Sequence, residues 1–211
     1  PTCTAISDSS EIGIGGYSFN SNILWRYQFT IEEQKAFSLN LKEYIAATIG
    51  ALLAVQNDDS PHPCILSLSD SSSTVSWLHK SNHDPTSSPC HNEVARWHAR
   101  NLMQNKAIDY SQHIKGSENH IADSLSRDFH LTEDKLLSLF KTVCPHLLPP
   151  NAQVVQLPPH LISKIASLAQ LQPNPRELNW QPKQSTIAHG VTGWNFYDDH
   201  RLPTPIWTST P

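Results

Sequence analysis

The chain has 211 residues, a formal net charge of −4 at pH 7 and only 16% charged residues. This length suits one sizeable core with a smaller appendage. The charge balance excludes a protein that is strongly basic along its whole length, as many nucleic-acid binders are, so any contact with nucleic acid must be local.

The cysteines and the apolar runs indicate an intracellular protein. Four cysteines stand far apart without a C-x-x-C pair, and no apolar leader suggests secretion, so we expect reduced thiols and no zinc site. The longest apolar stretch, at 45–55, is too short to span a bilayer. We expect a soluble protein, cytoplasmic or nuclear and not secreted, with no membrane partner. Because the chain begins at Pro1 and has a single methionine, Met103, we expect a fragment of a longer polypeptide.

The first thirty residues have the pattern of three antiparallel strands. Short runs of apolar, β-branched and aromatic residues at 3–7, 13–19 and 23–29 are separated by Ser, Asn and Gly. The glycines of SDSSEIGIGG, at 7–16, suggest a nucleotide-binding loop, but a strand rather than a helix follows them. We therefore interpret these glycines as turn and strand positions.

The spacing of apolar residues then changes to that of a helix. Residues 40–56 repeat apolar side chains at three- and four-residue steps, and 64–70 is an apolar run that fits an inner strand. Helices at 72–80 and 90–106, a strand at 107–114 and a helix at 118–127 follow. The predicted fold is α/β, with a mixed five-stranded sheet (three antiparallel strands, then parallel additions) flanked by helices.

The last third of the chain differs in composition and holds most of the sixteen prolines. We expect one or two short helices there, one of them at 161–171, within a linker or an appendage wrapped on the core. The predicted organisation is a domain at 1–130 and a Pro-rich C-terminal extension at 131–211.

Four acids occupy corresponding places in the predicted elements. Asp8 lies on the first strand and Glu43 in the first turn of the long helix, while Asp70 ends the inner strand and Asp123 lies in the last helix. If the two strands are neighbours at the sheet centre, the four carboxylates converge. Such a cluster repels itself unless cations lie within it, and divalent ions with oxygen ligands fit it. Two Mg²⁺ ions about 4 Å apart would support hydrolysis of a phosphodiester.

Each acid also has a structural alternative. Asp8 precedes a turn and can form an Asx turn, and Glu43 lies three residues after Asn40, as in a capping box. Asp70 can cap the next helix, and Asp123 can lie on a solvated helix face. The presence of one acid in each central element favours the metal site.

The sequence resembles the ribonuclease H domain of retrotransposon reverse transcriptase polyproteins. HIKGSENHIADSLSR, at 113–127, resembles the H-x-PG-K-E-N-x-x-ADALSR ending of gypsy-like elements. SDSSEIGIGG resembles the family's TDAS-x-x-G-x-GG, and SLSDSSSTVSWL its TDN-containing junction. NLKEYIAATIGALL resembles an Asn-Leu-x-Glu pattern like that of DIRS-like elements. The resemblance covers about residues 2–128.

The resemblance implies a ribonuclease H-like fold with four catalytic and metal-binding residues: Asp8, Glu43, Asp70 and Asp123. It implies Mg²⁺ as the cofactor, as two ions for which Mn²⁺ can substitute. It also implies an RNA/DNA hybrid as the substrate and a reverse transcriptase domain upstream in the polyprotein as a partner.

The sequence departs from the family pattern after the last strand. Lys115 stands where the family has proline, and the loop that carries a catalytic histidine in cellular ribonucleases H is missing at 116–118. His113 lies ten positions before Asp123, but aligning KG with KG places it within the strand, so we interpret it as structural. His113 and His120 remain possible auxiliary residues.

Candidate contacts to a hybrid lie after the inner strand and on the next helix. Reading a hybrid requires cations on the phosphates and contacts across a minor groove. The predicted nucleic-acid-binding residues are Ser71, Lys80, Arg96, Arg100 and Lys106, with His79, His83 and His98 also considered. The alternative is that these cations form a solvated helix face. We interpret Trp77 and Trp97 as core residues rather than stacking platforms.

Three functions compete at this point. The first is a metal-dependent endonuclease that hydrolyses the RNA strand of RNA/DNA hybrids during retroelement reverse transcription. The second is a catalytically inactive ribonuclease H-like tether or interaction domain of the polyprotein. The third, an integrase or transposase of the same fold, is disfavoured by the order of the four acids and by the ADSLSR ending. The presence of all four acids favours the first.

Overall fold

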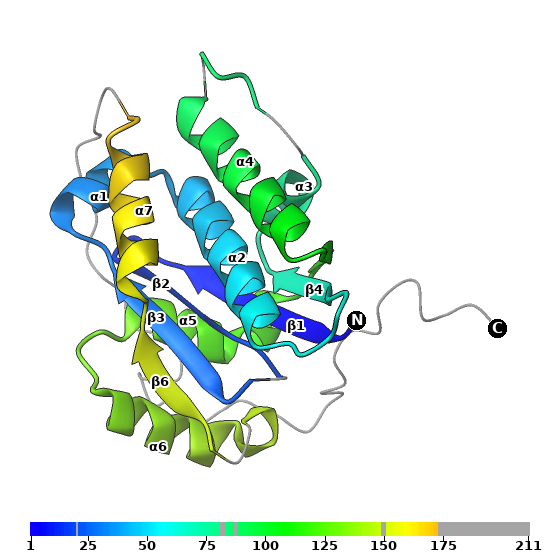
Figure 1. Cartoon of the computed structure of the whole chain (residues 1–211). Coiled ribbons are helices and arrows are strands. Elements are labelled where there is room, and N and C mark those ends of the chain that lie inside the picture. The colour runs from blue at the N-terminus through cyan, green and yellow to red at the C-terminus, as the bar shows by residue number, and fades with distance from the viewer. Residues whose placement is uncertain (20, 81–82, 87, 149–150, 173–211) are drawn as a thin grey trace.

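The computed structural model describes residues 1–19, 21–80, 83–86, 88–148 and 151–172. Six strands form one sheet: β1 Cys3–Ser9, β2 Gly13–Tyr17, β3 Ile23–Gln28, β4 Cys64–Ser69, β5 Ile108–His113 and β6 Gln153–Gln156. The helices are α1 Ile31–Ala36, α2 Leu39–Gln56, α3 Ser72–Leu78, α4 Pro89–Gln104, α5 His120–Arg127, α6 Glu133–Val143 and α7 Pro159–Ala169, with 3-10 turns η1 Gly116–Glu118 and η2 Pro145–Leu147. Figure 1 shows helices on both faces of the sheet.

The sheet is mixed and runs in the order β5-β4-β1-β2-β3-β6. β1, β2 and β3 pair antiparallel, β4 and β5 add in parallel beside β1, and β6 pairs parallel with β3. The predicted α/β class and the mixed sheet flanked by helices are confirmed. The predicted number of five strands is wrong, because residues 153–156 of the predicted Pro-rich extension form a sixth strand, β6.

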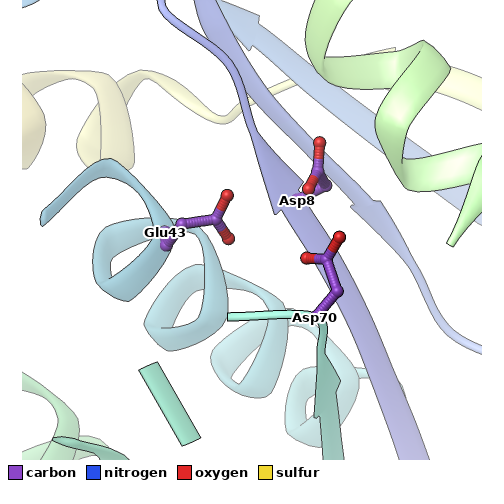
Figure 2. Close-up of side chains that lie close together, drawn as sticks. All are labelled: Asp8, Glu43 and Asp70. Atoms are coloured by element: carbon purple, nitrogen blue, oxygen red, sulfur yellow. The ribbon is translucent and has the colours of Figure 1, made fainter. Parts of the chain in front are cut away.

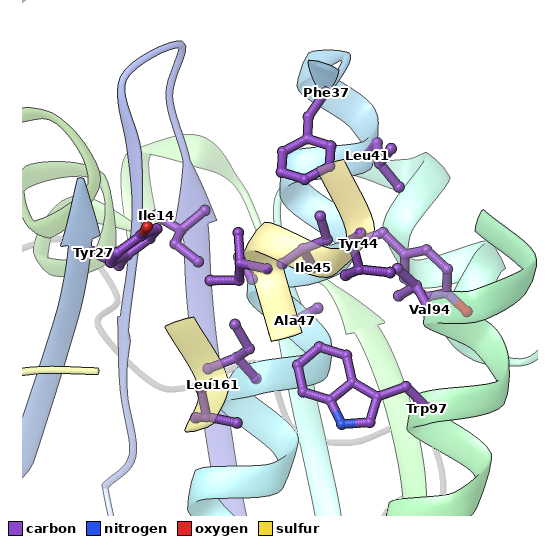
Figure 3. Close-up of a cluster of buried hydrophobic side chains, with 14 of the residues drawn as sticks. Ile14, Tyr27, Phe37, Leu41, Tyr44, Ile45, Ala47, Val94, Trp97 and Leu161 are labelled. Atoms are coloured by element: carbon purple, nitrogen blue, oxygen red, sulfur yellow. The ribbon is translucent and has the colours of Figure 1, made fainter. Parts of the chain in front are cut away.

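Two apolar layers hold the helices on the sheet. On one face, α2, α4 and α7 pack against β2 and β3, and Figure 3 shows Tyr44, Trp97 and Leu161 within this layer. On the other face, α5 and α6 pack against β1, β3 and β4 through residues such as Leu125 and Phe140. Residues from 131–172 enter both layers, so this part of the extension packs on the same sheet. Residues 173–211 lie outside the described part of the chain.

The long helix α2 is buried on nearly all sides and crosses the sheet centre. It begins after Ser38, whose hydroxyl accepts a hydrogen bond from the Leu41 amide at 3.3 Å. The cap of α2 is therefore Ser38 and not Asn40, so Glu43 is not part of a capping box and its side chain is available for other contacts. Within the described residues, no helix is both long and apolar enough to cross a membrane.

Candidate metal centre

Three of the four predicted acids meet at one end of the sheet centre. Asp8 lies in β1, Glu43 in the second turn of α2 and Asp70 directly after β4, and Figure 2 shows their carboxylates facing one another. One oxygen from each acid lies within 4.8 Å of those from the other two. Because β1 and β4 are adjacent and parallel, their carboxyl ends bring Asp8 and Asp70 together. The three residues can hold a metal ion, as hard oxygen ligands do.

Only one of the two oxygens of the Glu43 carboxylate accepts hydrogen bonds from the described residues. The backbone N–H and the hydroxyl of Ser9 donate to Glu43 Oε1 at 3.1 and 2.8 Å. Glu43 Oε2 is buried and has no hydrogen-bond partner among the described residues. A buried carboxylate oxygen without a partner is costly. A cation bound at this oxygen would compensate that cost, so the donor set fits a metal ion.

The Asp8 carboxylate is held from the other face of the sheet by α5. The Ser126 hydroxyl donates to Asp8 Oδ2 at 2.8 Å, and Asn119 Nδ2 lies 3.5 Å from Oδ1. Gly15, which pairs with Asp8 across β1 and β2, permits this approach, because a Cβ there would lie 2.4 Å from Leu125 Cβ. The glycine-rich segment therefore lets α5 pack directly on β2.

Burial and the charges of neighbouring acids raise the pKa values of the three acids. Burial raises the pKa of Asp8 well above its usual range, and the charges of Glu43, Asp123 and Asp70 add to that effect. For Glu43, burial raises the pKa to about 8, against the lowering effect of the Ser9 hydrogen bond. Burial also raises the pKa of Asp70. A divalent cation would favour the charged form of all three.

Asp123 lies near this group but outside it. Its carboxylate is ion-paired with Arg127, four residues later on α5. The charge of Asp123 contributes to the raised pKa values of Asp8 and Asp70. Burial alone would lower the pKa of Arg127, but the charges of Asp123 and Asp8 raise it overall. The guanidinium is thus a resident cation beside the acids, which the sequence analysis did not anticipate.

The residues on either side of the acids have structural contacts. His113 Nε2 lies 3.0 Å from the carbonyl oxygen of Asp70, which agrees with a structural role at the end of β5. His120 is buried in α5. The hydroxyl of Ser71 caps α3 by accepting from the Thr74 amide at 3.3 Å, so Asp70 is not the cap.

The predicted phosphate-binding cations are exposed and lie on or beside α3 and α4. They are Lys80, Arg96, Arg100 and Lys106. Arg100 is ion-paired with Glu93 at 2.8 Å. His98, which was also considered, is buried and its Nε2 lies 3.2 Å from Asp109 Oδ2, so it is unsuited to contact nucleic acid. Trp97 is buried in the core, as predicted. Trp77 is partly buried and packs against the same core.

The electrostatics predict a pH-dependent response to divalent metal. Because the Glu43 pKa is raised from 4.5 to about 8, the folded state holds more protons than the unfolded state between these values. The free energy of unfolding should therefore fall as pH rises across that range in EDTA.

Mg²⁺ at about 100 times its Kd should add about 2.7 kcal/mol to the free energy of unfolding at pH 8, which raises Tm by about 5–10 °C. The rise should be smaller at pH 5.5, where protons compete with the ion. Thermal unfolding with Mg²⁺ or EDTA at both pH values measures this, and an equal shift at both would contradict it.

Comparisons of the chain with protein-family models, with curated proteins and with solved structures find no match. The functional interpretation therefore depends on the sequence motifs together with the geometry of Asp8, Glu43 and Asp70.

Proposed function

We propose that this chain is a metal-dependent endoribonuclease of ribonuclease H-like fold that hydrolyses the RNA strand of RNA/DNA hybrids during retroelement reverse transcription. The observation that carries the proposal is the convergence of Asp8, Glu43 and Asp70, with a buried Glu43 oxygen that lacks a protein partner among the described residues. Three antiparallel strands followed by parallel strands beside β1 agree with the fold that the resemblance implies.

The chain's own residues arrange the acids for divalent ions. Asp8, Glu43 and Asp70 would hold Mg²⁺ or Mn²⁺, and the second ion that the resemblance implies would require Asp123, which is paired with Arg127. Bound ions would supply a water nucleophile and would stabilise charge on the leaving oxygen. Ser9 and Ser126 each fix one oxygen of a buried acid. The other oxygens of these two acids would then hold the ions.

The proposed substrate is recognised through its shape and its phosphates. A hybrid presents 2′-hydroxyls in a wide minor groove and phosphates along both strands. Lys80, Arg96 and Lys106 are exposed cations near α3 and α4. They would supply local positive charge for phosphate contacts in a chain whose net charge is −4. In the proposed context an upstream reverse transcriptase domain helps hold the hybrid.

Asp70→Asn is expected to abolish cleavage of a labelled RNA/DNA hybrid in Mg²⁺ or Mn²⁺. The substitution keeps the shape of the side chain but removes one of the three converging charges, so we expect a loss of at least about 100-fold, as when transition-state charge stabilisation is removed. The matched control is Asp134→Asn, an exposed acid in the first turn of α6, which should cleave like the wild type.

Two results would contradict the proposal. One is cleavage that persists unchanged in Asp70→Asn. The other is a wild-type chain that binds the hybrid with either metal present and does not cleave it, and this result would favour the inactive tether.

A further inference from the structure

We propose that Ser126 is a positioning residue of the metal centre, which holds the Asp8 carboxylate in the orientation that binds a divalent cation. This inference rests on the proposed function, because it concerns the same three acids. Ser126 belongs to the ADSLSR ending, and no role followed for it from the sequence. Its side chain lies on α5, on the opposite face of the sheet from α2 and Glu43.

The contact between Ser126 and Asp8 is short and fully enclosed. The Ser126 hydroxyl lies 2.8 Å from Asp8 Oδ2 and 3.0 Å from the carbonyl oxygen of Asp123. Its single proton therefore has two acceptors, and a carboxylate is the stronger of them. Ser126 has no exposed surface and Asp8 is 3% exposed, so bulk water does not compete for this proton.

The other contact to the Asp8 carboxylate is much weaker. Asn119 Nδ2 lies 3.5 Å from Asp8 Oδ1 and 3.4 Å from the carbonyl oxygen of Ser7. Both distances are at the limit for hydrogen bonds. Among the described residues, Ser126 thus makes the one short side-chain hydrogen bond to Asp8. It engages Oδ2 and leaves Oδ1 largely unengaged.

Glu43 shows the same arrangement. Ser9 engages Glu43 Oε1, and Oε2 is the oxygen without a partner among the described residues. Each buried acid of the group is therefore held at one oxygen by a serine hydroxyl. Hydrogen-bonding partners behind a metal ligand fix its rotamer, and their removal typically costs about 10–100-fold in metal affinity. We expect this effect when the Ser126 hydroxyl is removed.

The chain contains a closely matched control for this effect. Ser124 lies on the same helix, also has no exposed surface, and donates to Asp128 Oδ2 at 2.6 Å. Ser124→Ala and Ser126→Ala remove the same hydroxyl from the same helix, each from a buried carboxylate. Of these two carboxylates, only that of Asp8, the acceptor of Ser126, belongs to the three converging acids.

The test is a titration of the full chain with Mn²⁺. Binding is measured by calorimetry and by the electron paramagnetic resonance signal of the free ion. Ser126→Ala should raise the Kd for Mn²⁺ by about 10–100-fold, while Ser124→Ala should stay within about twofold of the wild type. Ser126→Cys, which keeps a donor at this position but a weaker and larger one, should fall between the wild type and Ser126→Ala. This variant also provides the comparison if Ser126→Ala folds poorly.

The outcomes separate this inference from the proposed function. Equal Mn²⁺ affinity of Ser126→Ala and the wild type, or equal loss in both alanine variants, would overturn the positioning role while the metal centre itself stands. A wild-type chain that binds no Mn²⁺ would overturn the metal centre and the positioning role together.

Discussion

Glu43→Gln is expected to make the metal-free protein more stable at pH 8 and, at the same time, to abolish its stabilisation by Mg²⁺. The wild-type side chain is 7% exposed, and burial raises its pKa to about 8, so its charged form destabilises the fold. The amide oxygen of Gln can still accept from the N–H and hydroxyl of Ser9. Its NH₂ group takes the place of the unpartnered Oε2 and can donate toward Asp8 and Asp70.

The expected gain in stability follows from removing an unsatisfied buried group. That group costs about 1–3 kcal/mol, which corresponds to a rise in Tm of about 2–12 °C in EDTA at pH 8. The gain should shrink at pH 5, because Glu43 of the wild-type protein is then protonated and neutral. In Mg²⁺ the order should reverse, since the wild type gains stability and the variant does not.

Thermal unfolding in EDTA and in Mg²⁺, at pH 5 and pH 8, measures these differences. Glu32→Gln is the control, because Glu32 is exposed in the first turn of α1 and its replacement should change neither response. A Glu43→Gln protein that is less stable than the wild type in EDTA at pH 8, or one that Mg²⁺ still stabilises, would contradict the account of this acid.

Ending the chain after residue 130 is expected to unfold the remainder. Such a cut removes β6, which pairs with β3, and leaves that edge of the sheet unpaired. It also removes Phe140 from one apolar layer and Leu161 and Ile165 from the other. Loss of a single large core side chain costs about 2–5 kcal/mol. Several such losses exceed a typical total stability of about 5–15 kcal/mol.

The same cut removes two of the partners of a buried cation, Arg26, and leaves it the carbonyl oxygen of Asp128 at 3.3 Å. Arg26 is 5% exposed, and its NH2 group donates to the carbonyl oxygen of Leu131 at 2.9 Å. Glu133 lies 3.8 Å from the same group. The loss of the Glu133 carboxylate and of the Leu131 carbonyl leaves the charge of Arg26 poorly compensated, which is destabilising.

The control is a chain that ends after residue 172, which retains every described element. Circular dichroism and thermal unfolding should show a cooperative transition for 1–172 and none for 1–130. A cooperative transition of 1–130 at a similar temperature would instead support an independent domain that ends there.

The elements predicted most closely from the sequence are those with a sustained apolar or alternating pattern. The buried helix α2 and the strands β1 to β4 have sustained apolar or alternating residues, so their positions follow closely from periodicity. β6 has only four residues and follows a proline-rich segment, and its pairing with β3 depends on tertiary contact. A four-residue segment carries too little periodicity to distinguish a strand from a linker.

A local signal was available for one element that the sequence analysis missed. Thr30 and Glu33 form a capping box at the start of α1, in the sequence TIEE. This pattern predicts a helix start from the sequence alone. α1 is only six residues long and has no sustained apolar period, so periodicity alone does not indicate it.

The convergence of three acids at the candidate site could be predicted from the sequence. The residues that contact those acids could not. Asp8, Glu43 and Asp70 meet as the order of elements implies, because adjacent parallel strands and a helix crossing them fix those three positions. The pairing of Asp123 with Arg127 depends on rotamers, which an order of elements does not specify. The contact of Ser126 with Asp8 likewise depends on how closely α5 packs on Gly15.

We propose that the converging acids form a metal centre that cleaves the RNA strand of a hybrid. The most direct measurement labels the RNA strand in one hybrid and the DNA strand in an identical hybrid, and follows both with the purified chain in Mg²⁺ or Mn²⁺. The account predicts metal-dependent internal cleavage of the RNA strand only, which is lost in EDTA and in Asp70→Asn. Cleavage of the DNA strand, cleavage that survives EDTA, or intact RNA in a hybrid that the chain binds would contradict it.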